Sequence, residues 1–409
     1  MAARRSARRR HRGLDIAVLR AVAVGSAAAP LLPILDDVLA AQAGAILPVP
    51  ADDTRQSKLL TTSLRVGEFI DEEVAVVVST SGTTGTPKGA MLSASALRAG
   101  AEATHRRLGG PGRWLLALPG HHIAGLQVII RSVVAGTVPV EIPASFEVAE
   151  LPSAIAALGS GRRYASLVAV QLDKALSDPA ARAALAELDA VLIGGGPMPA
   201  GVAERAAAAG IRVVRTYGMS ETAGGCVYDG APLDGVAVRI DDGRIVLGGA
   251  TVAAGYRNPV DPDPFADPGW FRTDDLGVID DSGVLRVLGR VDDAISTGGL
   301  TVLPQLVEAA LATHPAVADC AVFGIADGRL GQRVVAAIVP TSGAAAPNLA
   351  EVRAHVTRSL DATAAPREIH VVDELPRRGI GKLDRRALAA AFAPGQSGRE
   401  LPNRSVAAR

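Results

Sequence analysis

The segment Ser79-Thr80-Ser81-Gly82-Thr83-Thr84-Gly85-Thr86-Pro87-Lys88-Gly89 decides how the rest of the chain is interpreted. It directly follows Val74–Val78, a β-branched run that predicts a buried strand. The glycines let the backbone approach a ligand closely, and successive N–H groups with neighbouring hydroxyls can surround phosphate oxygens. Lys88 adds a positive charge for the same oxygens. The alternative, a flexible surface loop, does not explain why so many hydroxyl side chains directly follow an apolar strand.

Other nucleotide and nucleophile motifs are missing from the sequence. The loop is not a Walker A motif, because Pro87 stands where that motif has its second glycine and no Gly-Lys-Ser/Thr follows. The chain also has no Gly-x-Ser-x-Gly, His-Glu-x-x-His or Cys-x-x-Cys pattern. We therefore expect catalysis by positioning and charge stabilisation rather than by a side-chain nucleophile.

Composition limits the class of protein. The 409 residues are 48% hydrophobic, which is enough for two or more domains with sizeable cores. Lysine plus arginine and aspartate plus glutamate both number 42, a balance that argues against nucleic acid or a membrane surface as partner. Cys226 and Cys320 lie far apart and form no metal-ligand or disulfide pattern, so we expect a cytoplasmic protein. The oligomeric state is left open, and a homodimer is compatible with the sequence.

The two ends of the chain differ from the rest. Residues 1–14 hold six arginines and are predicted to form a disordered basic arm, with a secretion signal as the alternative. DNA binding through this arm is a separate alternative, which would be salt-dependent. Arg20 and the prolines after it interrupt the next apolar run, so no segment reaches the about 20 residues of a membrane span. Residues 394–409 are polar and are predicted to form a disordered tail.

The middle of the chain predicts an α/β fold. Strand-like runs alternate with Ala-rich helical runs, which indicates a large domain, residues 15–289, of mainly parallel sheet covered by helices. The runs are Val74–Val78, Arg113–Leu118, Ser166–Val170, Ala190–Ile193 and Val213–Val214, with helices at Ala180–Leu188 and Gly201–Ala209. Short strands between Val236 and Val287 predict a β-rich subdomain. A small, mobile α+β domain is expected over 290–393, with helices at Pro304–Ala312, Leu349–Leu360 and Asp384–Phe392 and strands at Cys320–Phe323 and Val334–Val339.

Five motifs, in order, resemble those of the acyl-adenylate-forming family, which includes acyl-CoA synthetases, adenylation domains and luciferases. They span roughly residues 74–390. After the phosphate loop come Tyr217-Gly218-Met219-Ser220-Glu221-Thr222, Trp270-Phe271-Arg272-Thr273-Asp274-Asp275-Leu276, Gly289-Arg290-Val291-Asp292-Asp293 and Arg378-Gly379-Ile380-Gly381-Lys382. The resemblance implies a two-domain enzyme that uses ATP, Mg²⁺ and coenzyme A.

The resemblance also implies roles for particular residues. ATP phosphates would be bound by Ser79, Thr80, Ser81, Gly82, Thr83, Thr84, Gly85 and Lys88. Adenine would lie on Gly195, Gly196, Thr216, Tyr217, Gly218 and Ser220, and the ribose on Asp275 and Arg290. Gly298 and Gly299 would let the pantetheine arm pass. The family usually has glycine where Asp274 stands, which is a departure beside the ribose position.

Three charged residues are the expected catalytic groups. Glu221 is a hard oxygen ligand suited to Mg²⁺ beside phosphates. Lys88 and Lys382 would stabilise the negative charge that develops at the α-phosphate, with Lys382 delivered by rotation of the small domain. Asp292 matches the hinge of that rotation. For each position the alternative is a solvated surface charge, and for Arg290 a surface arginine at a linker.

His122 and Arg131 are the candidates for reading the acid. In the family, a histidine or aromatic residue at the position of His122 gates the acyl pocket; a packed core histidine is the alternative. Arg131 lies in the apolar run Val128–Val134 and would pair with a second carboxylate of the substrate, the alternative being a snorkelling arginine. This arrangement resembles the o-succinylbenzoate–CoA ligases of menaquinone biosynthesis. Another aryl- or acyl-CoA ligase, a stand-alone adenylation enzyme and a non-catalytic nucleotide-binding protein are the rival interpretations.

Overall fold

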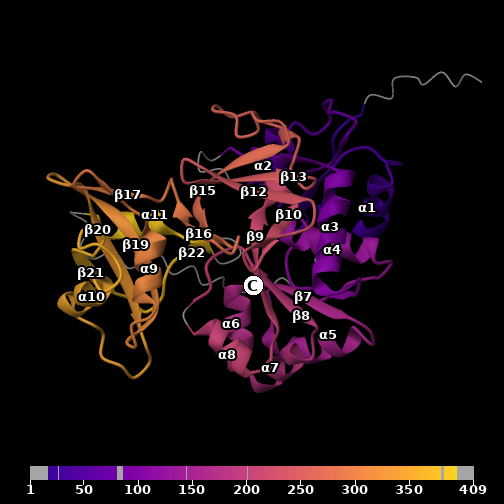
Figure 1. Cartoon of the computed structure of the whole chain (residues 1–409). Helices are drawn as coiled ribbons and strands as arrows, with labels where there is room; N and C mark the ends of the chain where they lie inside the picture. Colours follow the sequence, from indigo (N-terminus) through magenta and orange to yellow (C-terminus); the bar gives the residue numbers. More distant parts are fainter. Residues whose placement is uncertain are drawn as a thin grey trace, which may run out of the picture.

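The computed structural model describes residues 17–25, 27–80, 86–143, 145–199, 201–378 and 382–393. The predicted arm and tail lie outside these residues, as do Ser81–Gly85 of the phosphate loop and Gly379–Gly381. For Lys382 the description covers the backbone only. The α/β fold class is confirmed, with a large part built on two sheets and a smaller part that follows the four-stranded sheet (Figure 1).

A seven-stranded sheet forms the centre of the large part, with the order β11-β10-β9-β8-β7-β5-β6. The strands from β6 to β9 are parallel, as expected, and β10 and β11 add an antiparallel edge. The bounds are β5 Arg113–Leu116, β6 Val140–Glu141, β7 Arg163–Val168, β8 Ala190–Gly194, β9 Val213–Met219, β10 Gly224–Tyr228 and β11 Ala231–Pro232. The predicted strand at 213–214 is thus the start of a longer strand that continues through Tyr217.

Both faces of this sheet are covered, and its strand β8 is apolar at every position. In β8, Val191 and Ile193 pack on one side, where the helices are α5 Leu151–Ala157, α6 Ala169–Ser177, α7 Pro179–Ala186 and α8 Val202–Ala208. Ala190 and Leu192 pack on the other side, against α3 Ala94–Leu108 and α4 Ile123–Val134. A continuous apolar run is the pattern expected of a parallel strand buried on two faces.

A second sheet, β1-β2-β3-β4-β14, shares the core around α3 and α4. The central strand β3 Val74–Val78 is buried throughout, and β4 Ala90–Ser93 returns antiparallel to it. The phosphate loop therefore connects two paired strands. Helix α3 begins directly after β4, with Ser93 Oγ accepting a hydrogen bond from the Ala96 N–H at 3.1 Å.

Sequence analysis missed the start of this sheet. Strand β1 Arg20–Val24 is parallel to β2 Ile46–Pro50, and helix α1 Leu31–Leu39 connects them. Prolines in β2 argue against a strand, because proline cannot donate to a ladder. The structure accommodates them because β2 pairs with β3 only at Ile46 and Val76.

The predicted β-rich region is an antiparallel sheet of β12 Val236–Asp241, β13 Arg244–Gly249, β15 Trp270–Ile279 and β16 Leu285–Arg290. One strand inside that range, β14 Gly255–Tyr256, does not join this sheet but pairs with β4 of the second sheet. The part after β16 contains β17 Ile295–Thr297, β18 Leu300–Val302, α9 Pro304–Leu311, β19 Val317–Asp327, β20 Gly331–Pro340, α10 Leu349–Val356, β21 Glu368–Val371, β22 Arg377–Arg378, β23 Lys382–Leu383 and α11 Arg385–Ala391. Figure 1 shows these elements together on one side of the molecule. Within the described ranges, no helix combines the length and apolarity that crossing a bilayer requires.

A buried histidine between α3 and the central sheet gives a test of this packing. His105 is 5% exposed and lies 6.4 Å, ring to ring, from Trp114. Burial, with a further contribution from the Arg131 charge, lowers its pKa to about 4. Between pH 6.5 and 4 the unfolded chain therefore binds more protons at this residue than the folded chain, so acidification destabilises the fold.

The variant His105→Phe should reduce this pH dependence. Its unfolding free energy should fall less steeply than that of the wild type between pH 7 and pH 5, by up to ~1.4 kcal/mol per pH unit. Urea unfolding at several pH values measures the difference. Equal slopes for the two proteins would show that His105 does not enter the folded core uncharged.

Candidate active site

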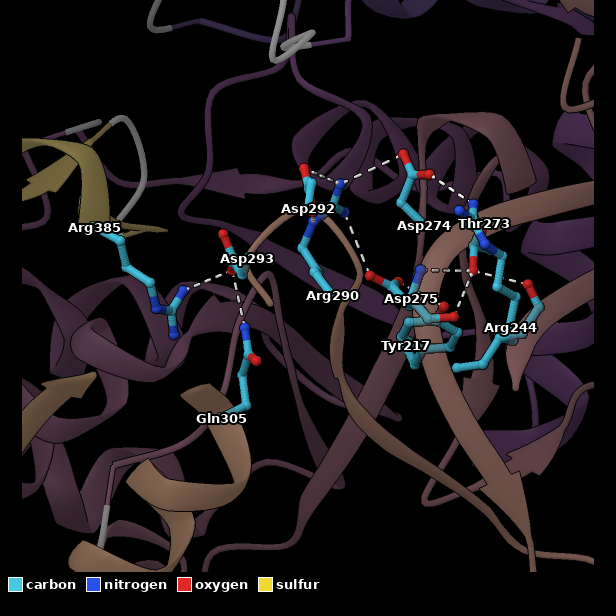
Figure 2. A network of polar contacts seen from close by, with 11 residues as sticks. Tyr217, Arg244, Thr273, Asp274, Asp275, Arg290, Asp292, Asp293, Gln305 and Arg385 are labelled. Carbon is cyan, nitrogen blue, oxygen red and sulfur yellow. Dashed lines mark hydrogen bonds and ion pairs between the residues drawn. The ribbon is translucent and has the colours of Figure 1, made fainter. Parts of the chain in front are cut away.

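Asp275 lies where three candidate residues meet. Tyr217, on β9, donates its hydroxyl hydrogen to Asp275 Oδ2 at 2.7 Å, and Arg290, at the end of β16, donates from Nη1 to Oδ1 at 3.3 Å (Figure 2). The carboxylate of Asp275 is held further by its own backbone, since its N–H donates to Thr273 Oγ1 at 3.0 Å. The structure thus brings together the predicted adenine and ribose residues from two different sheets.

The electrostatics of this contact suit a ligand with hydroxyl donors. Asp275 is 8% exposed, and burial raises its pKa, although the Tyr217 hydrogen bond and the Arg290 charge oppose that shift. Burial, followed by the Asp275 charge, raises the pKa of Tyr217, so the phenol stays protonated and donates. A carboxylate has about four acceptor positions. Asp275 can therefore accept from two ribose hydroxyls while it keeps both protein partners.

A second group lies around Glu221, in the turn that follows β9. Tyr256, on β14, donates its hydroxyl hydrogen to Glu221 Oε1 at 2.6 Å. Lys88 Nζ lies 5.2 Å from the centroid of the Tyr256 ring, within cation–π range. Two of the three predicted catalytic residues are thus joined by a tyrosine that sequence analysis missed. Tyr256 stands in a stretch without a recognisable motif, and only the pairing of β14 with β4 brings it here.

The residues after Tyr256 fix the end of the phosphate loop. The Arg257 N–H donates to the Gly89 carbonyl at 2.8 Å, and the Asn258 N–H donates to the Lys88 carbonyl at 2.9 Å. The Asn258 side chain also donates to the Pro87 carbonyl at 2.8 Å. Because three successive carbonyls are held in this way, the backbone of Lys88 has a defined position beside Glu221 even though its neighbours 81–85 lie outside the described residues.

The residues around Glu221 are suited to binding Mg²⁺ together with the phosphates of a nucleotide. Glu221 is 8% exposed and supplies hard carboxylate oxygens. Within the ranges that the structure covers, no three His, Cys, Asp or Glu side chains gather as a metal cage. Magnesium usually takes one or two carboxylates, with substrate phosphates and water completing the shell. Glu221 beside a phosphate loop corresponds to that arrangement.

The predicted adenine-binding glycines lie at the ends of β8 and β9. Gly195 has a φ of 83°, and space is open around the position where Gly196 would carry a Cβ atom. At Gly218 a Cβ atom would lie 2.1 Å from the Gly224 carbonyl, so β9 and β10 can pair only with glycine there. Thr216 donates from Oγ1 to the Ile193 carbonyl at 3.3 Å, and Ser220 opens the turn of Glu221. The geometry is compatible with the expected roles, which stay predictions.

The candidates for the hinge, the pantetheine path and the catalytic lysine lie at or beyond the end of β16. Asp292 accepts two hydrogen bonds from Arg290, at 2.8 and 3.0 Å. Burial alone lowers the pKa of Arg290, but the Asp292 hydrogen bond and charge outweigh that effect and raise it. Gly298 and Gly299 form the tight turn between β17 and β18, with φ values of 60° and 84°. The backbone of Lys382 pairs with that of Arg378 in the hairpin of β22 and β23. The hinge, pantetheine and catalytic roles stay predictions.

His122 lies at the N-cap of α4, half-buried, with its ring 4.3 Å from the ring of His121. Helix α4 starts beyond the carboxyl end of β5, the side of the parallel sheet on which ligands bind in open α/β folds. A gating role for His122 is compatible with this place and stays a prediction.

Arg131 is buried within helix α4. It is 4% exposed, donates from Nη2 to the Tyr228 hydroxyl at 3.2 Å and stacks on the Trp114 ring at 4.9 Å. Between His122 and Arg131, α4 packs so closely on β10 that a Cβ atom at Gly224 would lie 3.1 Å from Gln127. The snorkelling alternative is wrong, because the guanidinium is buried. The Tyr228 and Trp114 contacts favour a structural role for the guanidinium, and the expected pairing with a substrate carboxylate stays a prediction.

A model of the AMP-binding enzyme family matches residues 38–256, and a model of the AMP-binding enzyme C-terminal domain matches residues 306–382. The chain belongs to the AMP-binding enzyme family. It is 68% identical, over 377 residues, to a probable 2-succinylbenzoate–CoA ligase of Mycobacterium tuberculosis, covering 91% of this chain and 97% of that protein. It is 35% identical to the 2-succinylbenzoate–CoA ligase of Geobacillus kaustophilus, over 78% of this chain and 69% of that protein.

Solved structures are similar as well. The o-succinylbenzoate coenzyme A synthetase of Bacillus subtilis, in complex with its acyl-adenylate intermediate, has a TM-score of 0.70 and 25% identity over 91% of this chain and 88% of that one. ATP-bound MatB of Rhodopseudomonas palustris has a TM-score of 0.79 and 23% identity over 93% and 90%. The second likeness establishes the fold only.

Replacing Tyr256 by phenylalanine tests the group around Glu221. Tyr256→Phe keeps the ring near Lys88 but removes the hydrogen bond that orients the carboxylate. Loss of such a partner typically weakens metal binding by about 10–100-fold. We expect a comparable rise in the Mg²⁺ concentration needed for half-maximal pyrophosphate release. Glu221→Gln should raise it too.

Tyr164→Phe is the matched control, because Tyr164 is also buried but donates to the Gly110 carbonyl, away from the site. It should leave the Mg²⁺ requirement unchanged. A Tyr256→Phe enzyme that behaves like this control would place the metal elsewhere.

Arg131→Ala separates the structural role of this residue from the expected substrate role. Loss of a buried side chain and its cation–π contact should lower the unfolding free energy by ~2–4 kcal/mol. The ratio of kcat/KM for an aromatic acid with a second carboxylate to that for its monocarboxylic analogue should stay at the wild-type value. A ratio that falls by roughly 30-fold or more, the effect of losing a buried charge pair, would restore the substrate role.

Proposed function

We propose that this chain is an ATP-dependent 2-succinylbenzoate–CoA ligase that acts in menaquinone biosynthesis and forms AMP and pyrophosphate. The observation that carries the choice of acid is the 68% identity to a probable 2-succinylbenzoate–CoA ligase over nearly the whole of both chains. The geometry around Asp275 and Glu221 supports the chemistry, because both carboxylates lie near the end of β9: Asp275, suited to accept from hydroxyls, contacts Tyr217, and Glu221, suited to a metal, lies in the turn that follows the strand.

The first half-reaction forms the acyl-adenylate. A carboxylate oxygen of the acid bonds to the α-phosphorus of ATP, and the bond to pyrophosphate breaks. Asp275 and Arg290 hold the ribose, and Lys88 and Lys382 stabilise the charge on the phosphate. Glu221 would hold Mg²⁺, which when bound would supply further neutralisation of the phosphate oxygens. Such a step needs no side-chain nucleophile.

The second half-reaction transfers the acyl group. The sulfur of coenzyme A adds to the acyl carbonyl, AMP leaves with the electron pair of the broken C–O bond, and the thiol proton passes to solvent. We propose that the segment after residue 289 turns about Asp292 between the two steps. The turn at Gly298 and Gly299 would then line the path of the pantetheine arm, while Lys382 leaves the phosphate.

The two cysteines bear on the cellular location of the protein. Both cysteines are free, and Cys226 is buried, which suits a reducing compartment. We propose a cytoplasmic enzyme whose partners are its small-molecule substrates.

A panel of carboxylic acids tests the substrate assignment. 2-Succinylbenzoate should give the highest rate of thioester formation with ATP and coenzyme A, and monocarboxylic benzoates and short dicarboxylates should be slower. Thioester formation is followed by the loss of free thiol. A higher kcat/KM for another acid would support the rival acyl-CoA ligase assignment, and AMP formation without thioester would support a stand-alone adenylation enzyme.

Lys382→Ala tests whether Lys382 acts in adenylation only or in both half-reactions. If the lysine acts only on the phosphate, adenylation should fall by about 10²–10³-fold while thioester formation from a supplied acyl-adenylate stays near the wild-type rate. The two half-reactions are measured separately, by pyrophosphate release and by thiol loss. Equal loss in both would give Lys382 a different role.

A further inference from the structure

Asp293, beside the expected hinge, belongs to a partly buried set of ion pairs. Arg385, the first residue of α11, donates from Nη1 to Asp293 Oδ2 at 2.9 Å. Its other amino group donates to both oxygens of Glu308, on α9, at 2.9 and 2.7 Å. Its Nε donates to the Val322 carbonyl at 3.1 Å, so every nitrogen of the guanidinium is used. Gln305 adds a second hydrogen bond to Asp293 Oδ2, from Nε2 at 2.9 Å (Figure 2).

These pairs are partly shielded from water. The side chain of Arg385 is 17% exposed, that of Glu308 is 12% exposed and that of Asp293 is 27% exposed. Burial raises the pKa of Glu308, and the charge of Arg385 opposes the shift. Losing one partner would leave the others charged and poorly solvated, which is costly. The guanidinium fork also fixes direction as well as distance, which a lysine at the same position could not do.

The set joins two functional segments of the chain. Asp293 directly follows Asp292, whose carboxylate is paired with Arg290 and so with the nucleotide site. Arg385 follows the β22–β23 hairpin, whose second strand contains Lys382. The Asp384 N–H donates to the Pro376 carbonyl at 2.8 Å, so the two ends of the hairpin are tied together directly before Arg385. The position of the hairpin relative to the hinge therefore depends on Arg385.

We infer that Arg385 is a positioning residue for adenylation, which holds the Lys382 hairpin to the hinge residue Asp293. This inference rests on the proposed function. Lys382 must reach the α-phosphate within a narrow tolerance, and a misplacement of about 1 Å can cost roughly 100-fold in rate. In the proposed function, the turn at Gly298 and Gly299 rather than the hairpin serves the second half-reaction, so that step should not depend on Arg385.

A positioning role and a purely structural role for Arg385 predict different effects on the two half-reactions. If Arg385 only stabilised the small domain, its loss would lower both half-reactions together, because the domain serves both. If it positions the hairpin, adenylation falls and thioester formation from supplied acyl-adenylate does not. The ratio of the two rates is therefore the quantity to measure.

The test compares Arg385→Met and Asp293→Asn with the control Arg333→Met. Arg333 belongs to the same part of the chain and pairs with Glu368 at 2.8 Å, with 22% of its side chain exposed; among the described residues its hydrogen bonds go to Glu368 and the Ala326 carbonyl, away from the hinge. Adenylation is measured as pyrophosphate release with 2-succinylbenzoate, and thioester formation as thiol loss from synthetic acyl-adenylate. Thermal unfolding of each variant records its stability.

We expect Arg385→Met to lower adenylation by roughly tenfold or more and thioester formation by less than about threefold. Asp293→Asn should show the same selectivity, the double variant should add little, and Arg333→Met should leave the ratio at the wild-type value. Equal loss in both half-reactions, or a control that shifts the ratio equally, would overturn the inference.

Should Arg385→Met not fold, Arg385→Lys, which keeps the charge without the fork, is expected to show the same selectivity to a smaller degree. An unchanged ratio in that variant would overturn the inference as well. A wild-type enzyme that releases no pyrophosphate with any acid would instead refute the proposed function.

Discussion

The hydrogen-bonded contact of Asp275 with Tyr217 and Arg290 is the constraint on which the site depends. Tyr217 lies near the end of a strand of the central sheet, Asp275 lies in the antiparallel sheet, and Arg290 is the last residue of β16, two positions before the expected hinge. A single buried carboxylate thus joins three parts of the fold. Because an unpaired charge there would be costly, the sheets must meet in the register that brings these residues together. The same register places the Glu221 turn directly beyond Tyr217.

Sequence reasoning recovered what is encoded locally. Val74–Val78 was predicted with its observed bounds, and the three helices and two long strands of the small part were predicted to within a few residues, because apolar periodicity and capping residues act over short distances. The short strands β17, β18, β21, β22 and β23 were not predicted. The β1–β2 pair was missed because two prolines in β2 carry the local signature of a break. Their tolerance depends on how little β2 pairs with β3, which no local pattern reports.

The site divides in the same way. Residues inside recognisable motifs, such as Tyr217, Glu221 and Asp275, were identified and do lie together. Tyr256 was missed because its function comes from the pairing of β14 with β4, some 165 residues apart in sequence. Arg131 was given a substrate role from its isolation in an apolar run. That run indicates that the residue is buried, but it does not show which side of α4 faces a ligand. In the structure the guanidinium stacks on the Trp114 ring.

Incubation with isotopically labelled acid tests the central claim most directly. 2-Succinylbenzoate carrying ¹⁸O in its succinyl carboxylate is incubated with the enzyme, ATP, Mg²⁺ and coenzyme A, and the products are analysed by mass spectrometry. Adenylation by this site predicts one ¹⁸O atom in the phosphate of AMP and none in pyrophosphate, because the C–O bond broken in the second step leaves the labelled oxygen on phosphorus. Label in inorganic phosphate with formation of ADP, or unlabelled AMP, would contradict the account.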